Sequence, residues 1–281
     1  IYFERILIKM SSVTVNKNKQ MDMLNGSLTD KILIFAIPIA LSSILQQMFN
    51  AVDVAVVGRF ASSTAQAAVG GNGALINLLL NLFIGISVGA NVVIAKYIGQ
   101  GRTNRIKGAV HTAMLIAFFS GIILLVLGIS VAKPILELMG TPDDVINLST
   151  LYMRIYFLGM PFFMLYNYGA AVLRAVGDTK RPLMFLIVSG CINAVLNLIL
   201  VIGFSLSVVG VAVATVISQM ISCILVLRCL YKSEGSYQLR FSKLKINKKY
   251  MIQIFQVGVP AGIQSTVINF SNALLQSSVN S

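Results

Sequence analysis

The sequence predicts an all-α membrane protein, with one lobe of six transmembrane helices followed by the first helix of a second, parallel-repeat lobe. Of the 281 residues 57% are hydrophobic and only 11% are charged, and the mean hydropathy is +0.84. A soluble fold of this length would lack the polar residues to cover its surface. The apolar residues also gather in runs about twice as long as a barrel strand. In lipid a segment of this length can satisfy its backbone hydrogen bonds only as a helix, so the runs are predicted to be helical.

The first run covers residues 32–58, ILIFAIPIALSSILQQMFNAVDVAVVG. It exceeds the roughly 20 apolar residues that cross a bilayer as a helix. Pro38 lies near its start, and Asp53 is the only acid well inside any apolar run. No small-residue cleavage site follows the run, which argues against a removed signal peptide. The run is therefore interpreted as the first retained span.

Six further runs and the segments between them define the predicted organisation. The runs cover residues 67–95, 108–132, 146–175, 183–204, 208–227 and 251–281. The predicted regions are a basic cytosolic tail (1–31), a six-helix lobe (32–231), a basic cytosolic linker (232–250) and the first helix of a truncated second lobe (251–281). In the turn GDTKRP, Gly177 is expected to end one helix in a left-handed conformation, and Pro182 to lie in the first turn of the next.

The basic residues predict the orientation of the spans. If the N-terminus is cytosolic, 19 of the 22 Lys and Arg residues fall on the cytosolic side. Cytoplasmic loops accumulate such residues, so the segments around Arg102, Lys180 and Lys243 are predicted inside. Those around Ser62 and Pro142, and the turn near Ser205, are predicted outside.

The seventh run resembles the first. A shift of 222 residues lays VPAGIQSTVINFSN (259–272) over IPIALSSILQQMFN (37–50), matching Pro38 with Pro260. Both segments follow a basic stretch on the same predicted side, as a parallel repeat requires. The chain would then hold one lobe and the opening of a second.

Polar residues inside the runs are the candidate site residues. A charge in hydrocarbon costs about 2.5 to 3.5 kcal/mol or more, so Asp53 is a functional candidate by default. Its position 22 residues after Lys31 is about 33 Å along a helix, which would also suit the outer headgroups. Asn193 and Asn197 share one helix face and point either into a cavity or towards a neighbouring helix. Further candidates for the lobe interior are Gln46, Gln47, Asn50, Tyr166, Asn167 and Thr215.

The sequence argues against several functional classes, namely nucleic-acid binders, metal or haem proteins and enzymes. The basic residues lie between apolar runs, unlike the clustered surface of a nucleic-acid binder. Cys191, Cys223 and Cys229 form no CxxC pair and the chain has one His, which argues against disulfides, zinc or haem. No Gly-rich phosphate loop, metal-ligand cluster or catalytic triad is evident. We therefore expect no cofactor and no enzyme activity.

Three segments carry a family resemblance. They are PxxxxxxxQQMFNAVDVAVVGR from Pro38, GMPFFMLYNYGAAVLRAVGDTKRPL (159–183), and NAVLNLILVIGF followed by VVGVAVATVISQ (193–219). Over residues 27–281 the chain resembles the multidrug and toxic compound extrusion (MATE) transporters. Within them it is most similar to the bacterial branch of the DNA-damage-inducible protein F group. The resemblance implies an N-terminal fragment of a protein with twelve spans in two lobes around a central cavity.

The resemblance also implies a function. Such transporters of the bacterial plasma membrane exchange organic cations or drugs for protons or sodium ions. Asp53 would be the cation-coupling residue in the lobe cavity, and Pro38 a hinge where the missing backbone hydrogen bond lets the helix bend. Many relatives carry an acid where this chain has Asn197. Its absence favours protons bound by a single carboxylate over sodium.

Two alternatives stay open. A lipid or polysaccharide flippase of the same superfamily would line its lobe with basic residues, and the nearest candidate here is Arg154 at the outer start of the fourth span. A fragment with half a cavity could instead be inactive in transport, because half a cavity cannot alternate access.

Overall fold

The computed structural model describes residues 28–280, apart from the side chains of Leu28, Lys31, Ala74 and 269–280. Nearly all of the predicted basic tail therefore lies outside the described residues. The helices are α2 (Leu28–Phe60), α3 (Ser63–Gly99), α4 (Thr103–Leu138), α5 (Asp143–Leu158), α6 (Met160–Ala175), α7 (Lys180–Leu198), α8 (Ser207–Lys232) and α9 (Lys248–Asn280). A π-helical turn, η2 (Ile199–Gly203), extends α7, and a 3₁₀ turn, η3 (Phe241–Lys243), lies before α9.

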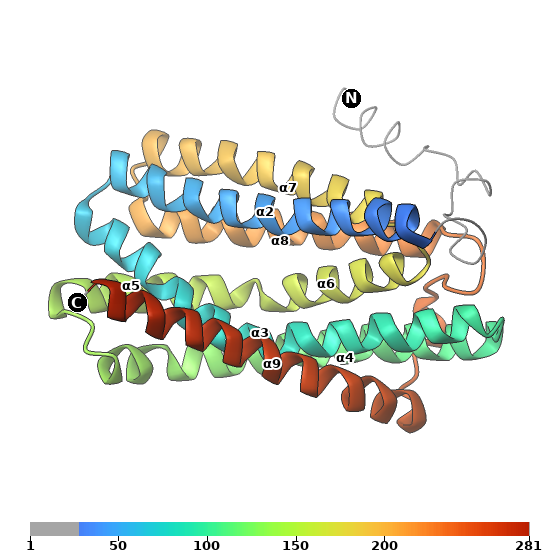
Figure 1. Cartoon of the computed structure of the whole chain (residues 1–281). Coiled ribbons are helices and arrows are strands. Elements are labelled where there is room, and N and C mark those ends of the chain that lie inside the picture. Colours follow the sequence, from blue (N-terminus) through green and yellow to red (C-terminus); the bar gives the residue numbers. More distant parts are fainter. Residues whose placement is uncertain (1–27, 281) are drawn as a thin grey trace.

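The described helices confirm the predicted class. Six of them are long and apolar enough to cross a membrane, and α5 with α6 forms a seventh candidate span as a bent pair. These spans run antiparallel to their chain neighbours in one bundle (Figure 1). Because consecutive spans alternate in direction, their connections fall at two opposite ends. We call the end formed by residues 100–102, 176–179 and 233–247 the basic end.

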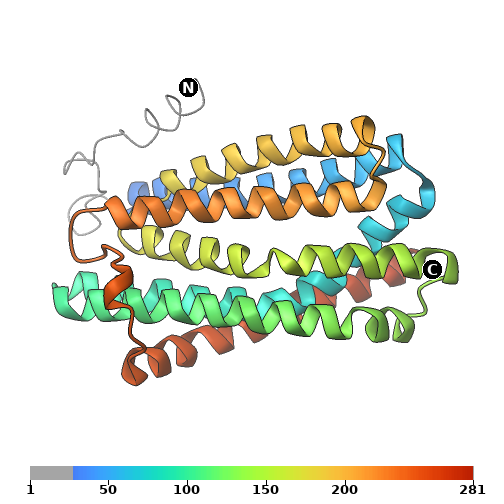
Figure 2. The same ribbon diagram turned by 180° about the vertical axis from the view of Figure 1, so that it is seen from behind.

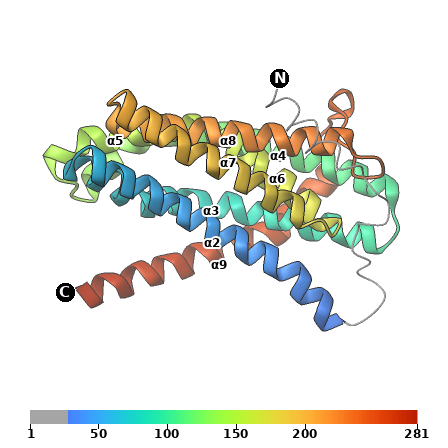
Figure 3. The ribbon, with the colours of Figure 1, turned by 90° about the horizontal axis from the view of Figure 1, so that it is seen from above.

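Helix α6 is the centre of the bundle. It packs against α3 and α4 on one side and against α8 on the other. Helices α2 and α7 pack against each other and against α8, so these three form one layer beside α6 (Figures 1 and 2). Helix α9 packs along α3, which it crosses at an angle (Figure 3).

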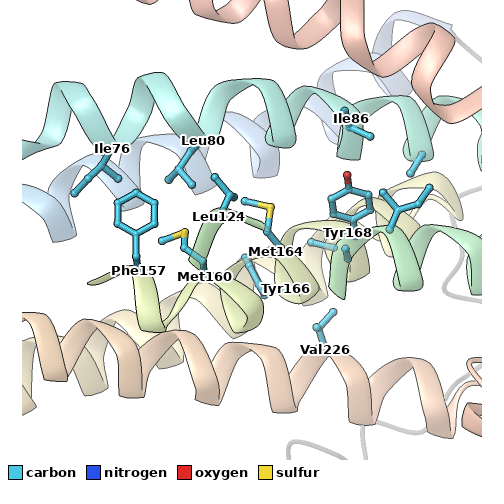
Figure 4. Close-up of a cluster of buried hydrophobic side chains, with 14 of the residues drawn as sticks. Ile76, Leu80, Ile86, Leu124, Phe157, Met160, Met164, Tyr166, Tyr168 and Val226 are labelled. Carbon is cyan, nitrogen blue, oxygen red and sulfur yellow. The ribbon is translucent and has the colours of Figure 1, made fainter. Parts of the chain in front are cut away.

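The core follows the buried face of α5 and α6. Phe157, Met160, Met164 and Tyr168 are fully buried. Figure 4 shows Phe157 and Met160 on the side of Ile76 and Leu80 of α3, and Tyr168 on the side of Ile86. Thioethers adapt to irregular gaps, which suits the position beside the bend that follows Phe157. This packing fixes α6, which contributes Phe163 and Tyr166 to the cavity described below.

The bend between α5 and α6 differs from the single continuous span that the sequence predicted for residues 146–175. The two helices meet at 49° around Gly159. Pro161 lies in the first turn of α6. Its ring provides no N–H and clashes with the carbonyl four residues earlier, which kinks or breaks a helix. At Gly159 the missing Cβ leaves room for the side-chain oxygen of Gln219 on α8. The bend therefore brings α5 and α8 together.

The turn GDTKRP forms as the sequence predicted. Gly177 has φ +83°, and Pro182 lies in the first turn of α7. The Asp178 side chain accepts a hydrogen bond from the Arg181 amide at 3.1 Å and pairs with the Arg181 guanidinium at 3.1 Å. The Tyr166 hydroxyl donates to the Pro182 carbonyl at 3.0 Å and so ties α6 to the start of α7.

The crossing of α3 and α9 is made by four glycines. Gly85 and Gly89 on α3 face Gly258 and Gly262 on α9. A Cβ on Gly258 would lie 2.5 Å from the Ile86 Cα, and one on Gly262 would lie 2.7 Å from the Leu82 carbonyl oxygen. Pairs of small residues spaced by four let helix backbones approach closely in membranes. The two backbones are therefore in direct contact here.

Candidate functional site

A polar cavity of about 180 Å³ lies inside the layer formed by α2, α7 and α8 and the facing sides of α3, α5 and α6. Only one of the described residues that line it, Asp53, is charged. The other polar lining residues are Gln46, Gln47, Asn50, Asn77, Tyr156, Tyr166, Ser189, Asn193, Thr215, Ser218, Gln219 and Ser222. Its apolar wall includes Phe49 and Phe163.

Asp53 lies in the last third of α2 and is only 5% exposed. One carboxylate oxygen accepts a hydrogen bond from the Asn197 amide of α7 at 2.5 Å. The other accepts from the Thr215 hydroxyl of α8 at 3.4 Å. Both partners are neutral, and the cavity wall supplies no cation among the described residues. The structure thus places this carboxylate in the lobe interior, although the sequence left the outer headgroups open.

Asn193 completes a ring of hydrogen bonds with these three residues. The Asn197 amide nitrogen also donates to the Asn193 side-chain oxygen at 3.3 Å, and the Asn193 amide nitrogen donates to the Thr215 hydroxyl at 3.4 Å. The side-chain oxygen of Asn197 has no partner among the described residues although it is buried. The ring therefore contains one unused acceptor next to the carboxylate.

Thr215 has one hydroxyl proton and two acceptors in reach. The Val211 carbonyl lies 2.9 Å from the hydroxyl oxygen, and the Asp53 carboxylate lies at 3.4 Å. When the proton points to Val211, the hydroxyl oxygen faces Asp53 as an acceptor and suits a protonated carboxyl. When it points to Asp53, it suits the ionised carboxylate. One small rotation thus accommodates both protonation states.

The π-helical turn η2 begins two residues after Asn197. It is closed by the Phe204 amide, which donates to the Ile199 carbonyl at 3.1 Å, five residues earlier. Such turns interrupt the regular helical spacing and occur frequently at functional sites. Here the turn lies between Asn197 and the short connection to α8, which carries Thr215.

The structure brings together most of the residues that the sequence singled out. The seven that line the cavity are Gln46, Gln47, Asn50, Asp53, Tyr166, Asn193 and Thr215. Asn197 is fully buried behind the cavity wall and reaches Asp53 from there. Asn167 lies apart, since its amide donates to the Phe163 carbonyl one turn earlier on its own helix. Pro38 is buried within the continuous helix α2, where its carbonyl accepts the Ser42 hydroxyl at 2.8 Å.

Several cavity residues were missed. Ser218, Gln219 and Ser222 follow Thr215 by three, four and seven residues, and a polar stripe with this spacing on an apolar helix was a readable signal. Tyr156 gave no such signal. It lines the cavity from α5, which bends at Gly159 and packs against α8.

Comparison with known proteins identifies the family. The MatE family model matches residues 38–199. The chain is 37% identical over 256 residues to the probable multidrug resistance protein YoeA of Bacillus subtilis, covering 88% of this chain and 55% of that one. It is 23% identical to the multidrug export protein MepA of Staphylococcus aureus, covering 86% and 53%.

The fold agrees with solved structures. A MATE crystal structure in a bent conformation superposes with a TM-score of 0.85 at 21% identity, covering 92% of this chain and 58% of that one. The chain spans about half the length of the relatives it matches. With the family model matching more than half of its residues, the chain belongs to the MatE family of multidrug and toxic compound extrusion transporters.

Proposed function

We propose that the chain forms the first lobe, and the opening of the second, of a secondary transporter that exports organic cations from a bacterial cell in exchange for protons. The motifs that begin at Pro38 and at Gly159 also favour the branch that resembles the DNA-damage-inducible protein F group. The relatives that are named as multidrug proteins support the substrate class.

The observation that carries the proposal is the environment of Asp53. Its carboxylate is buried, is held by two neutral donors and has no counter-charge in the described cavity wall. Burial without a counter-charge disfavours the ionised form of a carboxylate. A proton or a cationic substrate would each relieve the buried charge, so the two compete for this side chain.

The cavity wall suits an organic cation when Asp53 is ionised. Phe49, Tyr156 and Phe163 offer aromatic faces, which attract cations, and the amide and hydroxyl groups offer neutral polar contacts. Protonation of Asp53 removes the attraction, and the Thr215 hydroxyl can then turn to Val211. In this mechanism the substrate leaves when the proton is loaded. Bending of α2 at Pro38, where a backbone hydrogen bond is missing, would reshape the cavity at that step.

Protons are favoured over sodium as the coupling ion. Sodium sites combine several oxygen ligands, and among the described residues of the cavity wall only Asp53 offers a carboxylate, the rest being neutral amide and hydroxyl oxygens. Among the described residues no cluster of three acidic, His or Cys side chains could hold a metal ion. At Asn197, where the family resemblance implies an acid in many relatives, this chain contributes an amide N–H to Asp53 instead.

The alternative flippase function finds less support. A phosphate-bearing substrate would need basic groups in the cavity, and the described lining residues include no Lys or Arg. Arg154 lies exposed on α5 and is not among them. A fragment inactive in transport remains the second alternative, because the chain spans about half the length of its relatives.

The test is Asp53→Asn in a protein extended to the length of the relatives. Everted membrane vesicles with an imposed pH gradient would be assayed for transport of a fluorescent cationic dye. We expect the variant to express and insert normally, and its transport to fall to the level of vesicles without the protein. Asp144→Asn is the matched control, since it makes the same change at an exposed acid at the start of α5. Unchanged transport by Asp53→Asn would refute the mechanism.

A further inference from the structure

A second cavity, of about 370 Å³, lies at the basic end of the bundle, outside the site described above. It is an open cavity between the start of α4 and the segment that connects α8 to α9. Its described lining residues are Lys107, Gly108, His111, Gly235, Gln238, Arg240, Lys243, Lys245, Ile246 and Asn247. We call it the linker pocket.

The linker pocket concentrates positive charge. Lys107, Arg240, Lys243 and Lys245 line it, and none of its described lining residues is acidic. Glu234, the one acid in the linker sequence, is not among them. Like charges gathered around a concave surface repel one another and raise the local concentration of anions. A positive-inside bias explains basic residues on this side of the membrane, but not their convergence on one cavity.

Buried residues of α4 hold the linker in place. His111 is 7% exposed, and its Nε2 accepts the backbone N–H of Arg240 at 3.2 Å. Its Nδ1 lies 2.7 Å from the Lys107 carbonyl and must carry the ring proton, because Nε2 is acting as the acceptor. The Thr112 hydroxyl oxygen accepts the backbone N–H of Asn247 at 3.1 Å. These two anchors fix the linker at both ends of the stretch that carries Lys243 and Lys245.

Gln238 fixes the guanidinium of Arg240. Its side-chain oxygen accepts a hydrogen bond from the Arg240 Nε at 3.0 Å, while its amide nitrogen donates to the Tyr231 carbonyl at 3.2 Å. The bond to Gln238 uses one of the five guanidinium N–H groups. The bond engages the guanidinium through Nε, and its terminal N–H groups, which take no part in that bond, suit an oxyanion.

We propose that the linker pocket binds a phosphate-bearing anion. Arg and Lys together are the usual recognition groups for phosphate, the former through paired N–H donors and the latter as point charges. The pocket lies where the apolar helices α4 and α9 begin, which is the level of lipid headgroups. An anionic lipid headgroup and a soluble phosphate offer the same chemistry. Either would link α4 to the linker that leads into α9.

The experiment compares two triple variants of the 281-residue chain purified in mild detergent. The pocket variant is Arg240→Gln, Lys243→Gln and Lys245→Gln. The control variant is Arg102→Gln, Lys180→Gln and Lys232→Gln, which removes one Arg and two Lys that are also exposed at the basic end but do not line the pocket. Both variants lose three positive charges. A difference in anion binding between them is therefore caused by the pocket residues and not by the net charge of the protein.

Two arms distinguish the sources of the phosphate. Native mass spectrometry measures retention of phosphatidylglycerol against phosphatidylcholine from an equal mixture, and equilibrium dialysis measures binding of radiolabelled inorganic phosphate without lipid. A basic residue near a membrane contributes about 1 kcal/mol of attraction, so three should give at least about a 10-fold preference. We expect the pocket variant to lose at least about 10-fold in one or both arms, and the control variant to stay within about 2-fold of the unmodified chain.

Binding in the lipid arm alone identifies a headgroup, and binding in the phosphate arm identifies a soluble ligand. An equal loss in the pocket and control variants would overturn the proposal, because diffuse surface charge would then explain the binding. Retained binding in the pocket variant, or no binding by the unmodified chain in either arm, would overturn it as well.

Discussion

Thr215 can form a hydrogen bond with Asp53 in both the protonated and the ionised state of that carboxyl group. Its single hydroxyl proton has the Val211 carbonyl and the Asp53 carboxylate as alternative acceptors. A hydrogen bond to a charged group contributes about 1.5 to 3 kcal/mol, so this donor matters most when Asp53 is ionised. The substrate-bound state of the proposed cycle should therefore depend on the hydroxyl.

We predict that Thr215→Val slows proton-driven dye transport at least about 10-fold in the extended protein, because the ionised Asp53 loses one of its two donors. Thr215→Ser keeps the hydroxyl and should stay within about 2-fold of the unmodified protein. Transport rates of the two variants in everted vesicles check this. Equal rates would mean that the hydroxyl serves only the backbone of α8.

The site residues that could be predicted from the sequence were the polar ones that interrupt an apolar run. Asp53, Asn193 and Asn197 are polar exceptions inside apolar runs, and the structure gathers all three in one ring of hydrogen bonds. Tyr156 could not be singled out in this way. It lines the cavity because α5 packs against α8, and sequence patterns report the period within one helix but not the contacts between two.

At the scale of elements, the α3–α9 crossing depends on backbones that touch. We predict that Gly89→Leu lowers the free energy of unfolding by about 1 to 3 kcal/mol or more, because a side chain at this position meets the backbone of Gly258 and Ile254. Thermal unfolding of the purified chain in detergent checks this. Gly71→Leu is the matched control on the same helix, since its Cβ would have no described atom within 4 Å.

If both variants lower the melting temperature by the same amount, the cause is the introduction of leucine into α3 and not the contact with α9. Protease cleavage of the 233–247 linker offers a second measurement, because loosening of α9 should expose this segment in Gly89→Leu but not in Gly71→Leu.

The number of candidate spans and their approximate positions were predictable because each apolar run is long enough to cross a bilayer. Two features were not. The bend at Gly159 depends on Pro161, which the interpretation of residues 146–175 as one span passed over. The π-helical turn η2 lies in an apolar sequence, ILVIG, that is equally compatible with a regular helix. Local geometry of this kind is decided by packing, not by hydropathy.

At the scale of the molecule, the charge pattern anticipated the two ends of the bundle. The turn after α3, the turn after α6 and the linker after α8 gather at the basic end, as the alternation of Lys and Arg required (Figure 1). The contact between α3 and α9 was not anticipated. Both helices carry a pair of glycines spaced by four, which is a readable signal for close helix packing, but the sequence alone does not pair one such motif with another.

The side of the membrane on which the basic end lies is a prediction. In a background without Cys191, Cys223 and Cys229, Lys180→Cys should resist a membrane-impermeant maleimide in intact bacteria and react after permeabilisation. Asp143→Cys, at the other end of the bundle, should react in intact cells. Labelling of Lys180→Cys from outside would reverse the orientation, and with it the proposed direction of transport.

The glycine crossing also has a consequence for biosynthesis. Gly85 and Gly89 enter the membrane long before their partners, Gly258 and Gly262, have been translated. At about 5 to 20 residues per second, the ribosome needs on the order of ten seconds or more to make the intervening chain. During this interval the small-residue face of α3 has only lipid or the translocation machinery beside it. The last described helix must therefore displace those neighbours, and a chain that stalls in the linker would leave a ready partner surface for the wrong helix.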